Sequence, residues 1–235
     1  FQVLADGENA IHFGERFCSI QRRHQKLLEE GPWLTEKVRA EIGERVCEGA
    51  RSVGYRGLAT FEFLRDKHGE FYFLEVNPRV QVEHTITEMI TGVDLVKMGI
   101  QVAAGQGLPL QQDQVQFSGH SIQCRLNAED PINFIPSPGK LWDCHFPGGR
   151  GVRVDTHAHI GYEMPGCFDS LLAKLIVWGQ DRDEAIAKMR AALTETTLIG
   201  VQTVVPLHLA ILNEPDFIAR DVTIQYLEDH PNLLG

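Results

Sequence analysis

The chain has 235 residues, of which 43% are hydrophobic and 23% charged, and its formal net charge is −10 at pH 7. This composition is typical of a globular protein with one large or two ordinary domains, and the acidic balance argues against a nucleic-acid partner, because phosphate backbones need a basic surface. No apolar run approaches the ~20 residues that cross a bilayer, so we also expect no membrane partner. The five cysteines are scattered without a C-x-x-C pair, which indicates reduced thiols and a cytoplasmic location.

The N-terminal part predicts strands and helices in alternation. Residues 1–5 resemble the interior of a strand and lack an initiator Met, so we expect a fragment or the remainder of something longer. Two β segments are expected around the turn at Asp6 and Gly7, the second running through 10–13 into 18–26. The remaining predictions are a helix over 36–52 capped by Thr35, a hairpin with arms 60–64 and 71–77, and a helix over 93–104.

After a glutamine-rich loop near 106–114 the sequence changes to short predicted strands separated by Gly and Pro. This change predicts a boundary between domains 1–110 and 117–235. We expect the first domain to form part of an antiparallel sheet with helices on one side. The second should be another α+β lobe, with strands over 120–127 and 171–178. Two helices should close the chain, one over 181–197 capped by Asp181 and one over 203–213 with Pro206 in its first turn.

The densest chemical feature is the run 75–84, in which polar residues alternate with apolar ones. On an extended strand its polar positions would project to one side. A half-buried strand with a solvated face is the alternative explanation. It fits poorly, because consecutive outward positions are all of metal-ligand, anion-binding or proton-transfer types. These positions are Glu75, Asn77, Arg79, Gln81 and Glu83.

Glu62 joins this group from the other arm of the predicted hairpin. Two carboxylates and an amide oxygen are hard ligands suited to Mg²⁺, which takes one or two carboxylates together with nucleotide phosphates. Arg79 offers a planar fork that binds a carboxylate-like anion in two places. Glu83 could then act as a base beside that anion.

These residues resemble a known superfamily. Glu62 within 60–64, followed by residues 75–79, is similar to the metal-binding core of ATP-grasp enzymes, which carbamoyl-phosphate synthetases share. The continuation 80–85 resembles the biotin carboxylase family, and further segments match that family in order along the chain. These segments are 21–26, 87–95, 119–131, 136–140 and 162–174.

The resemblance implies an α+β fold that combines the second part of an ATP-grasp domain with the biotin carboxylase C-terminal α+β domain. It implies ATP-dependent carboxylation of biotin with bicarbonate through carboxyphosphate, the first half-reaction of enzymes such as acetyl-CoA carboxylase. The implied cofactors are ATP, Mg²⁺ or Mn²⁺, and biotin as a carrier-bound substrate. The implied partners are bicarbonate, a biotin carboxyl carrier protein or domain, a carboxyltransferase component and a second copy in a homodimer.

The family's residue roles carry over to matching positions. Metal ions would be held by Glu62, Glu75 and Asn77. Bicarbonate would be bound by Lys26, Arg79, Gln81, the backbone of Val82, and Glu83, which is also the base. Biotin would be bound by Arg125 and Asp169, and Arg125 would stabilise the negative charge on the ureido oxygen of biotin. The nucleotide would contact Gln21, His24, Leu64 and Ile224 in addition to Glu62 and Glu75, and Arg153 would lie at the dimer contact.

Two alternatives stay open beside this interpretation. One is a different ATP-grasp ligase, such as half of a carbamoyl-phosphate synthetase, and the other is a non-catalytic dimerisation fragment. The family's N-terminal α/β domain and its Gly-rich lid are not in this sequence, so we expect the chain alone to be inactive. Carboxylases with several final acceptors share these motifs, and the sequence leaves the acceptor open.

Overall fold

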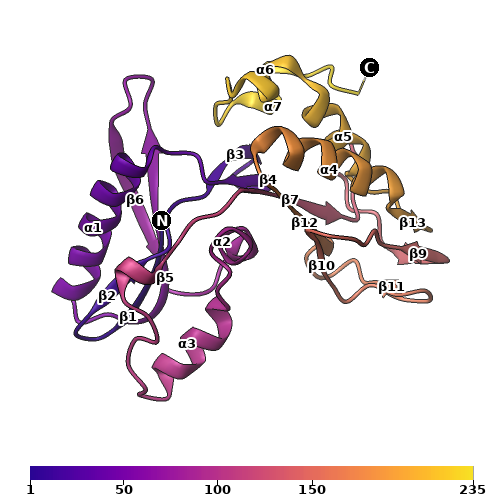
Figure 1. Cartoon of the computed structure of the whole chain (residues 1–235). Helices are drawn as coiled ribbons and strands as arrows, with labels where there is room; N and C mark the ends of the chain where they lie inside the picture. The colour runs from indigo at the N-terminus through magenta and orange to yellow at the C-terminus, as the bar shows by residue number, and fades with distance from the viewer. Residues whose placement is uncertain (235) are drawn as a thin grey trace. The chain divides into compact units, whose positions relative to one another are not determined.

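The structure is a computed structural model that describes residues 1–234, and it divides into two compact units. Unit 1 comprises Phe1–Phe17 and Gly31–Ser118, and unit 2 comprises Cys18–Glu30 and the chain from Gly119 onward (Figure 1). The compact units therefore divide differently from the sequence ranges 1–110 and 117–235, because Cys18–Glu30 groups with the second unit. The boundaries 1–110 and 117–235 remain a prediction about domains.

Unit 1 is built on a four-stranded antiparallel sheet with the order β2-β1-β5-β6. Its strands are β1 (Gln2–Asp6), β2 (Ala10–His12), β5 (Arg56–Arg65) and β6 (Phe71–Asn77). Its helices are α1 (Glu36–Ser52), α2 (His84–Thr91) and α3 (Leu95–Ala103), with a single 3₁₀ turn η1 (Gln112–Gln114).

Helices cover both faces of this sheet, so the expectation of helices on one side is wrong. Val3 and Ala5 pack with Val46 of α1, whereas Leu4, on the other face of β1, packs with Val102 of α3. Successive strand residues point to opposite faces. The uninterrupted apolar run over residues 3–5 therefore belongs to a strand that is buried on both sides.

Unit 2 is built on a five-stranded sheet with the order β10-β12-β7-β4-β3. Its strands are β3 (Phe17–Arg22), β4 (Gln25–Gly31), β7 (His120–Asn127), β10 (Val152–Thr156) and β12 (Leu171–Gly179). Two small sheets pair β8 (Gly139–Lys140) with β11 (Glu163–Met164), and β9 (Asp143–His145) with β13 (Thr197–Ile199). Its helices are α4 (Arg182–Glu195), α5 (Val205–Asn213), α6 (Pro215–Ala219) and α7 (Tyr226–Asp229).

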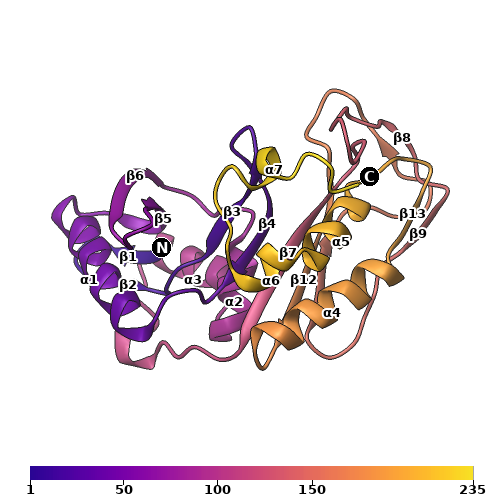
Figure 2. The ribbon, with the colours of Figure 1, turned by 90° about the horizontal axis from the view of Figure 1, so that it is seen from above.

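The main core of unit 2 lies between its sheet and its helices. Leu126 of β7 and Leu175 of β12 pack with Met189 of α4 and Ile211 of α5, and Figure 2 shows these helices beside the strands. Both faces of β7 are largely buried, although the sequence makes one of them polar. The polar residues of β7 are therefore tied into hydrogen bonds.

Most long elements are confirmed, including α1, the β5–β6 hairpin, α4 with Asp181 as its cap, and α5. Thr35 stands at the N-cap of α1, but its side chain makes no capping bond. The second β segment, predicted to run through 10–13 into 18–26, is wrong as one strand. Strand β2 ends at His12, and Arg23 and His24 adopt positive φ angles of 49° and 65° that turn the chain from β3 into β4. Helices α2, α6 and α7 were not predicted.

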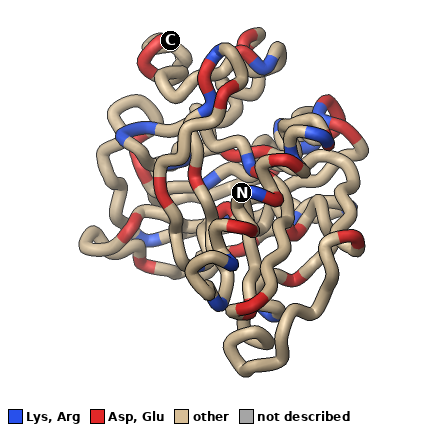
Figure 3. The backbone as a smooth tube through the Cα atoms, turned by 90° about the vertical axis from the view of Figure 1, so that its left-hand side faces the viewer, with Lys and Arg blue, Asp and Glu red and all other residues tan. Residues whose placement is uncertain are grey.

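Among residues 1–234, no helix is both long and apolar enough to cross a membrane. Acidic and basic positions are interspersed along the chain in Figure 3.

Candidate active site

A carboxylate pair lies where β5 and β6 are paired in unit 1. Glu62 and Glu75 are direct partners in the register of the hairpin, so their side chains share one face of the sheet. Asn77 Nδ2 donates to Glu62 Oε1 at 3.2 Å and to Glu75 Oε1 at 2.9 Å. The two carboxylates therefore converge on one amide group.

This donor set fits Mg²⁺. Carboxylate and amide oxygens are its preferred protein ligands, and a nucleotide-bound Mg²⁺ needs only one or two carboxylates because phosphates and water complete its shell. The amide of Asn77 donates its nitrogen to both carboxylates here, and turning the amide over would direct its oxygen to the same point. No group of three or more His, Cys, Asp or Glu suited to a metal occurs within residues 1–234.

The run after Asn77 does not continue as a strand, so the expectation that positions 75–83 project from one extended face is wrong. Pro78 follows Asn77 directly and lacks an N–H for the ladder. Arg79 N donates back to Asn77 O at 2.9 Å and turns the chain, and Glu83 becomes the N-cap residue of α2. Gln81 still reaches the carboxylate pair, because Nε2 donates to Glu62 Oε1 at 2.7 Å.

Arg16 anchors this cluster, and no motif of the sequence predicts its role. Its guanidinium donates to Gln81 Oε1 at 3.1 Å and to Thr60 Oγ1 at 3.0 Å. It also donates to Gln2 Oε1 and Thr87 Oγ1, each at 2.9 Å. Gln81 is thus held between a group that only donates and a carboxylate that only accepts, which fixes the orientation of its amide.

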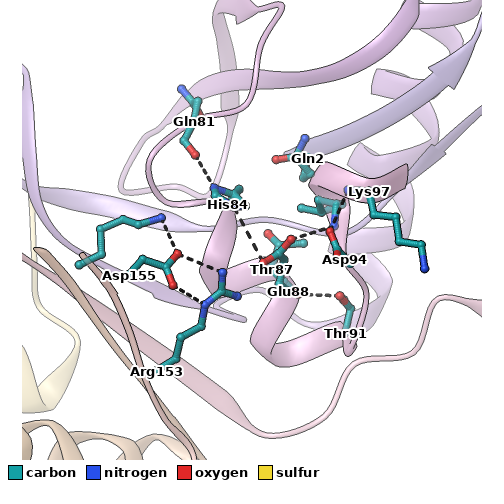
Figure 4. Close-up of polar contacts among 12 residues, drawn as sticks. Gln2, Gln81, His84, Thr87, Glu88, Thr91, Asp94, Lys97, Arg153 and Asp155 are labelled. Atoms are coloured by element: carbon teal, nitrogen blue, oxygen red, sulfur yellow. Dashed lines mark hydrogen bonds and ion pairs between the residues drawn. The ribbon is translucent and has the colours of Figure 1, made fainter. Parts of the chain in front are cut away.

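The helix that carries Glu83 is fixed by its own polar contacts. His84 Nδ1 contacts Gln81 O at 2.8 Å, and Glu88 Oε1 accepts from Leu95 N at 2.8 Å, which links α2 to the start of α3 (Figure 4). Asp94 caps α3 by accepting from Lys97 N at 2.8 Å. Glu83 itself is only 2% exposed. Glu88 and Asp94, both in segment 87–95, therefore have structural roles at the junction of α2 and α3.

Arg125 lies on β7 of unit 2 and is paired with Glu29 of β4. Arg125 Nη2 is 2.5 Å and Nε 2.7 Å from Glu29 Oε1. His208 Nε2 contacts the backbone oxygen of Arg125 at 2.8 Å. Burial lowers the pKa of His208 to about 4, so the ring is neutral at pH 7 and its Nε2 donates. Neither Glu29 nor His208 was predicted as a site residue.

A second buried carboxylate follows at Glu30. Its Oε2 is 2.7 Å from both His120 Nε2 and Arg182 Nε, and its Oε1 accepts from Arg182 Nη2 at 3.0 Å. Burial on its own would raise the pKa of Glu30, but the bonds from His120 and Arg182 outweigh it, so the pKa lies below its ordinary value. This cluster ties β4 to β7 and α4.

The other predicted residues of unit 2 occupy separate places. Lys26 is half-buried on β4, His24 is exposed in the β3–β4 turn, and Ile224 is exposed before α7. Gln21 lines a pocket of about 280 Å³. Asp169 is exposed, and its Oδ1 accepts from Leu171 N at 2.8 Å.

Arg153, expected at a dimer contact, is paired within its own chain. Its Nε donates to Asp155 Oδ1 at 2.8 Å, and Lys174 Nζ is 3.1 Å from the other oxygen of Asp155 (Figure 4).

The predicted site residues are distributed over both units. In unit 1, Glu62, Glu75, Asn77 and Gln81 form one connected cluster, Arg79 and Leu64 are exposed, and Val82 is half-buried. Unit 2 carries Gln21, His24, Lys26, Arg125, Arg153, Asp169 and Ile224. Arg125 has a buried acidic partner, Glu29, already in place.

Comparison with known proteins gives matches along nearly the whole chain. Residues 1–111 match the family described as carbamoyl-phosphate synthase L chain, ATP binding domain, and residues 123–229 match the biotin carboxylase C-terminal domain. The biotin carboxylase of Allochromatium vinosum is 53% identical over 97% of this chain and 51% of its own length. The biotin carboxylase of Pseudomonas aeruginosa is 50% identical over 97% of this chain and 51% of its own length.

A solved structure shows the same fold. It is the biotin carboxylase domain dimer of 2-oxoglutarate carboxylase from Hydrogenobacter thermophilus, in complex with MgADP, ADP and bicarbonate. It superposes with a TM-score of 0.97 at 47% identity, covering 100% of this chain and 53% of that one. The chain spans about half the length of the curated relatives it matches. These matches show that the chain belongs to the biotin carboxylase family.

Proposed function

We propose that this chain supplies the metal, bicarbonate and biotin contacts of a biotin carboxylase. Such an enzyme carboxylates carrier-bound biotin with bicarbonate at the expense of ATP. The observation that carries the proposal is the convergence of Glu62, Glu75, Asn77 and Gln81 in unit 1. It is supported by family matches that cover residues 1–111 and 123–229.

Glu62, Glu75 and Asn77 would hold Mg²⁺ or Mn²⁺. When bound, the metal neutralises phosphate charge, which is most of what phosphoryl transfer requires from its surroundings. Gln21, His24, Leu64 and Ile224 would contact the nucleotide. The relative from H. thermophilus binds MgADP and bicarbonate, which supports this donor set.

Bicarbonate would be held by Arg79, Gln81, Lys26 and the backbone of Val82. Glu83 removes the proton of bicarbonate, and the resulting oxygen attacks the γ-phosphorus of ATP, which gives carboxyphosphate and ADP. The burial of Glu83 and the fixed amide of Gln81 both support a preorganised site. Excluding water protects a short-lived intermediate.

Biotin would be bound by Arg125 and Asp169. As N1′ of biotin loses its proton, negative charge develops on the ureido oxygen, and a guanidinium stabilises it without losing its own proton. N1′ then bonds to the carboxyl carbon as the bond from that carbon to the phosphate oxygen breaks, and the departing phosphate takes the N1′ proton. The partners we propose are a biotin carboxyl carrier protein or domain, a carboxyltransferase component, and a second copy contacted through Arg153, all in the cytoplasm.

The experiment that tests these roles compares two variants of a full-length protein carrying this sequence. Glu83→Gln should abolish both bicarbonate-dependent ATP cleavage and biotin carboxylation, because an amide cannot accept the proton. Arg125→Ser should lower carboxylation by roughly 10²–10³-fold while some ATP cleavage persists. Normal coupled turnover in Glu83→Gln, or equal loss of both activities in Arg125→Ser, would contradict the assignment.

A second candidate is a ligase resembling carbamoyl-phosphate synthetase, because the family matched by residues 1–111 carries that description. The match of residues 123–229 to the biotin carboxylase C-terminal domain favours biotin as the acceptor. Supplying ammonia or biotin as the acceptor, with phosphate release as the readout, separates the two.

A further inference from the structure

Glu29 is a carboxylate buried in the sheet of unit 2. Its side chain is 0% exposed, whereas that of its partner Arg125 is 14% exposed. A buried carboxylate is costly unless it is paired and hydrogen-bonded. Glu29 meets this condition through the residue to which we assign the stabilisation of biotin.

Glu29 is held at both of its oxygens. Gln123 Nε2 donates to Oε2 at 3.0 Å, and Arg125 donates to Oε1. Gln123 and Arg125 are two positions apart on β7 and so share one face, while Cys124 between them points into the core on the other. A carboxylate bound at both ends cannot rotate, and the direction of its bond to Arg125 is fixed.

We propose that Glu29 is a positioning residue that sets the plane of the Arg125 guanidinium toward the ureido oxygen of biotin. The proposal rests on the proposed function of Arg125. A guanidinium is rigid and planar, so fixing Nε and one Nη fixes the direction of the whole group. His208 holds the backbone of the same residue through its carbonyl oxygen. A donor aimed before charge develops requires no reorganisation during the reaction.

The test uses Glu29→Gln in a full-length protein that carries this sequence. The amide keeps the shape but removes the charge, so Arg125 is no longer held in one direction. We expect the kcat of biotin carboxylation to fall by about 10- to 100-fold, the scale of a displacement of about 1 Å in a reacting group. Biotin-independent ATP cleavage should stay near the wild-type rate. Glu29→Asp keeps the charge at a shorter reach and should give an intermediate kcat.

Glu30→Gln is the matched control. Glu30 is the next residue on β4, is equally buried, and is bonded to Arg182 and His120 rather than to Arg125. We expect it to lower the melting temperature at least as much as Glu29→Gln while it preserves the ratio of carboxybiotin formed to phosphate released. If both variants lower the two activities in parallel with stability, Glu29 is only structural and the proposal is wrong.

The double variant Glu29→Gln/Arg125→Ser separates the proposal from its premise. It should carboxylate biotin no more slowly than Arg125→Ser alone, because Glu29 acts through Arg125. Additive losses would overturn the positioning role. If Arg125→Ser alone keeps full carboxylation, the function assigned to Arg125 fails instead. Should Glu29→Gln not fold, Glu29→Asp serves as the readout, and an unchanged kcat in a stable Glu29→Asp protein refutes the proposal.

Discussion

The buried imidazole of His208 should make unit 2 sensitive to mild acid. His208 is 0% exposed, and its burial lowers the pKa from 6.5 to about 4. Between these pH values the unfolded chain binds a proton that the folded chain does not. The contribution of neutral His208 to the stability of unit 2 is therefore complete above pH 6.5 and is lost as the pH falls toward 4.

The size of the effect follows from the shift. One pKa unit corresponds to 1.36 kcal/mol, so the shift of His208 amounts to about 3 kcal/mol at pH 4 and about 2 kcal/mol at pH 5. His208→Gln removes the titration and retains a donor for the carbonyl of Arg125. The variant should be less stable at pH 7, because an amide fills the site less well, but its stability should depend less on pH.

The measurement is amide hydrogen exchange of β7 and α5 between pH 7 and 5, corrected for the intrinsic exchange rates, so that only unit 2 is observed. His145→Gln, at an exposed position, is the control and should keep the wild-type pH dependence. The remaining titratable groups of unit 2 are common to wild type and His208→Gln, so their contributions to the pH dependence cancel in the comparison. Equal pH dependence in wild type and His208→Gln would show that His208 is not the group responsible.

Three further predictions concern the cluster around Glu62 and Gln81 in unit 1 and the cluster around Glu30 in unit 2. Arg16→Lys keeps the charge, but a lysine cannot reach all the acceptors of the Arg16 guanidinium, so Gln81 would be held less firmly. The KM for bicarbonate should therefore rise about 10-fold in steady-state kinetics, whereas the control Arg45→Lys, on the surface of α1, should leave it unchanged. Glu75→Gln removes one of the two carboxylates on Asn77 and should weaken Mg²⁺-dependent ADP binding in calorimetry, and unchanged affinity would exclude Glu75 as a ligand. Glu30→Gln leaves Arg182 without its buried counter-charge and should lower the free energy of unfolding in urea by about 3–5 kcal/mol. A decrease of less than about 1 kcal/mol would contradict this prediction.

Sequence periodicity was sufficient for the long elements of this fold. The apolar stripe of α1 and the turn signals between β5 and β6 both correspond to elements in the structure. The turn at Arg23 and His24 was missed because neither residue is a usual turn former, and both adopt positive φ here. The end of β6 at Asn77 was missed because the alternation of residues 75–83 favours an extended strand, although Pro78 ends the strand.

The candidate site could be predicted as a list of ligands but not as a network. The sequence places Glu62 and Glu75 on the two arms of one hairpin, but it does not give their pairing: the register shifts between Glu62 and Phe63, and without that shift Glu62 would face Leu74. Arg16, Glu29 and His208 act through contacts 65 to 96 residues apart along the chain, and local pattern does not encode such contacts. Two adjacent glutamates in the buried strand β4 were an available signal, since buried charge requires a partner.

Every residue role proposed above depends on transfer of the carboxyl group of bicarbonate to biotin. This transfer can be measured by supplying a full-length protein that carries this sequence with labelled bicarbonate, ATP, Mg²⁺ and free biotin, and by quantifying labelled carboxybiotin. We expect label in biotin that depends on both ATP and Mg²⁺ and disappears in Glu83→Gln. Label that enters carbamoyl phosphate when ammonia is supplied, with none in biotin, would contradict the proposed function.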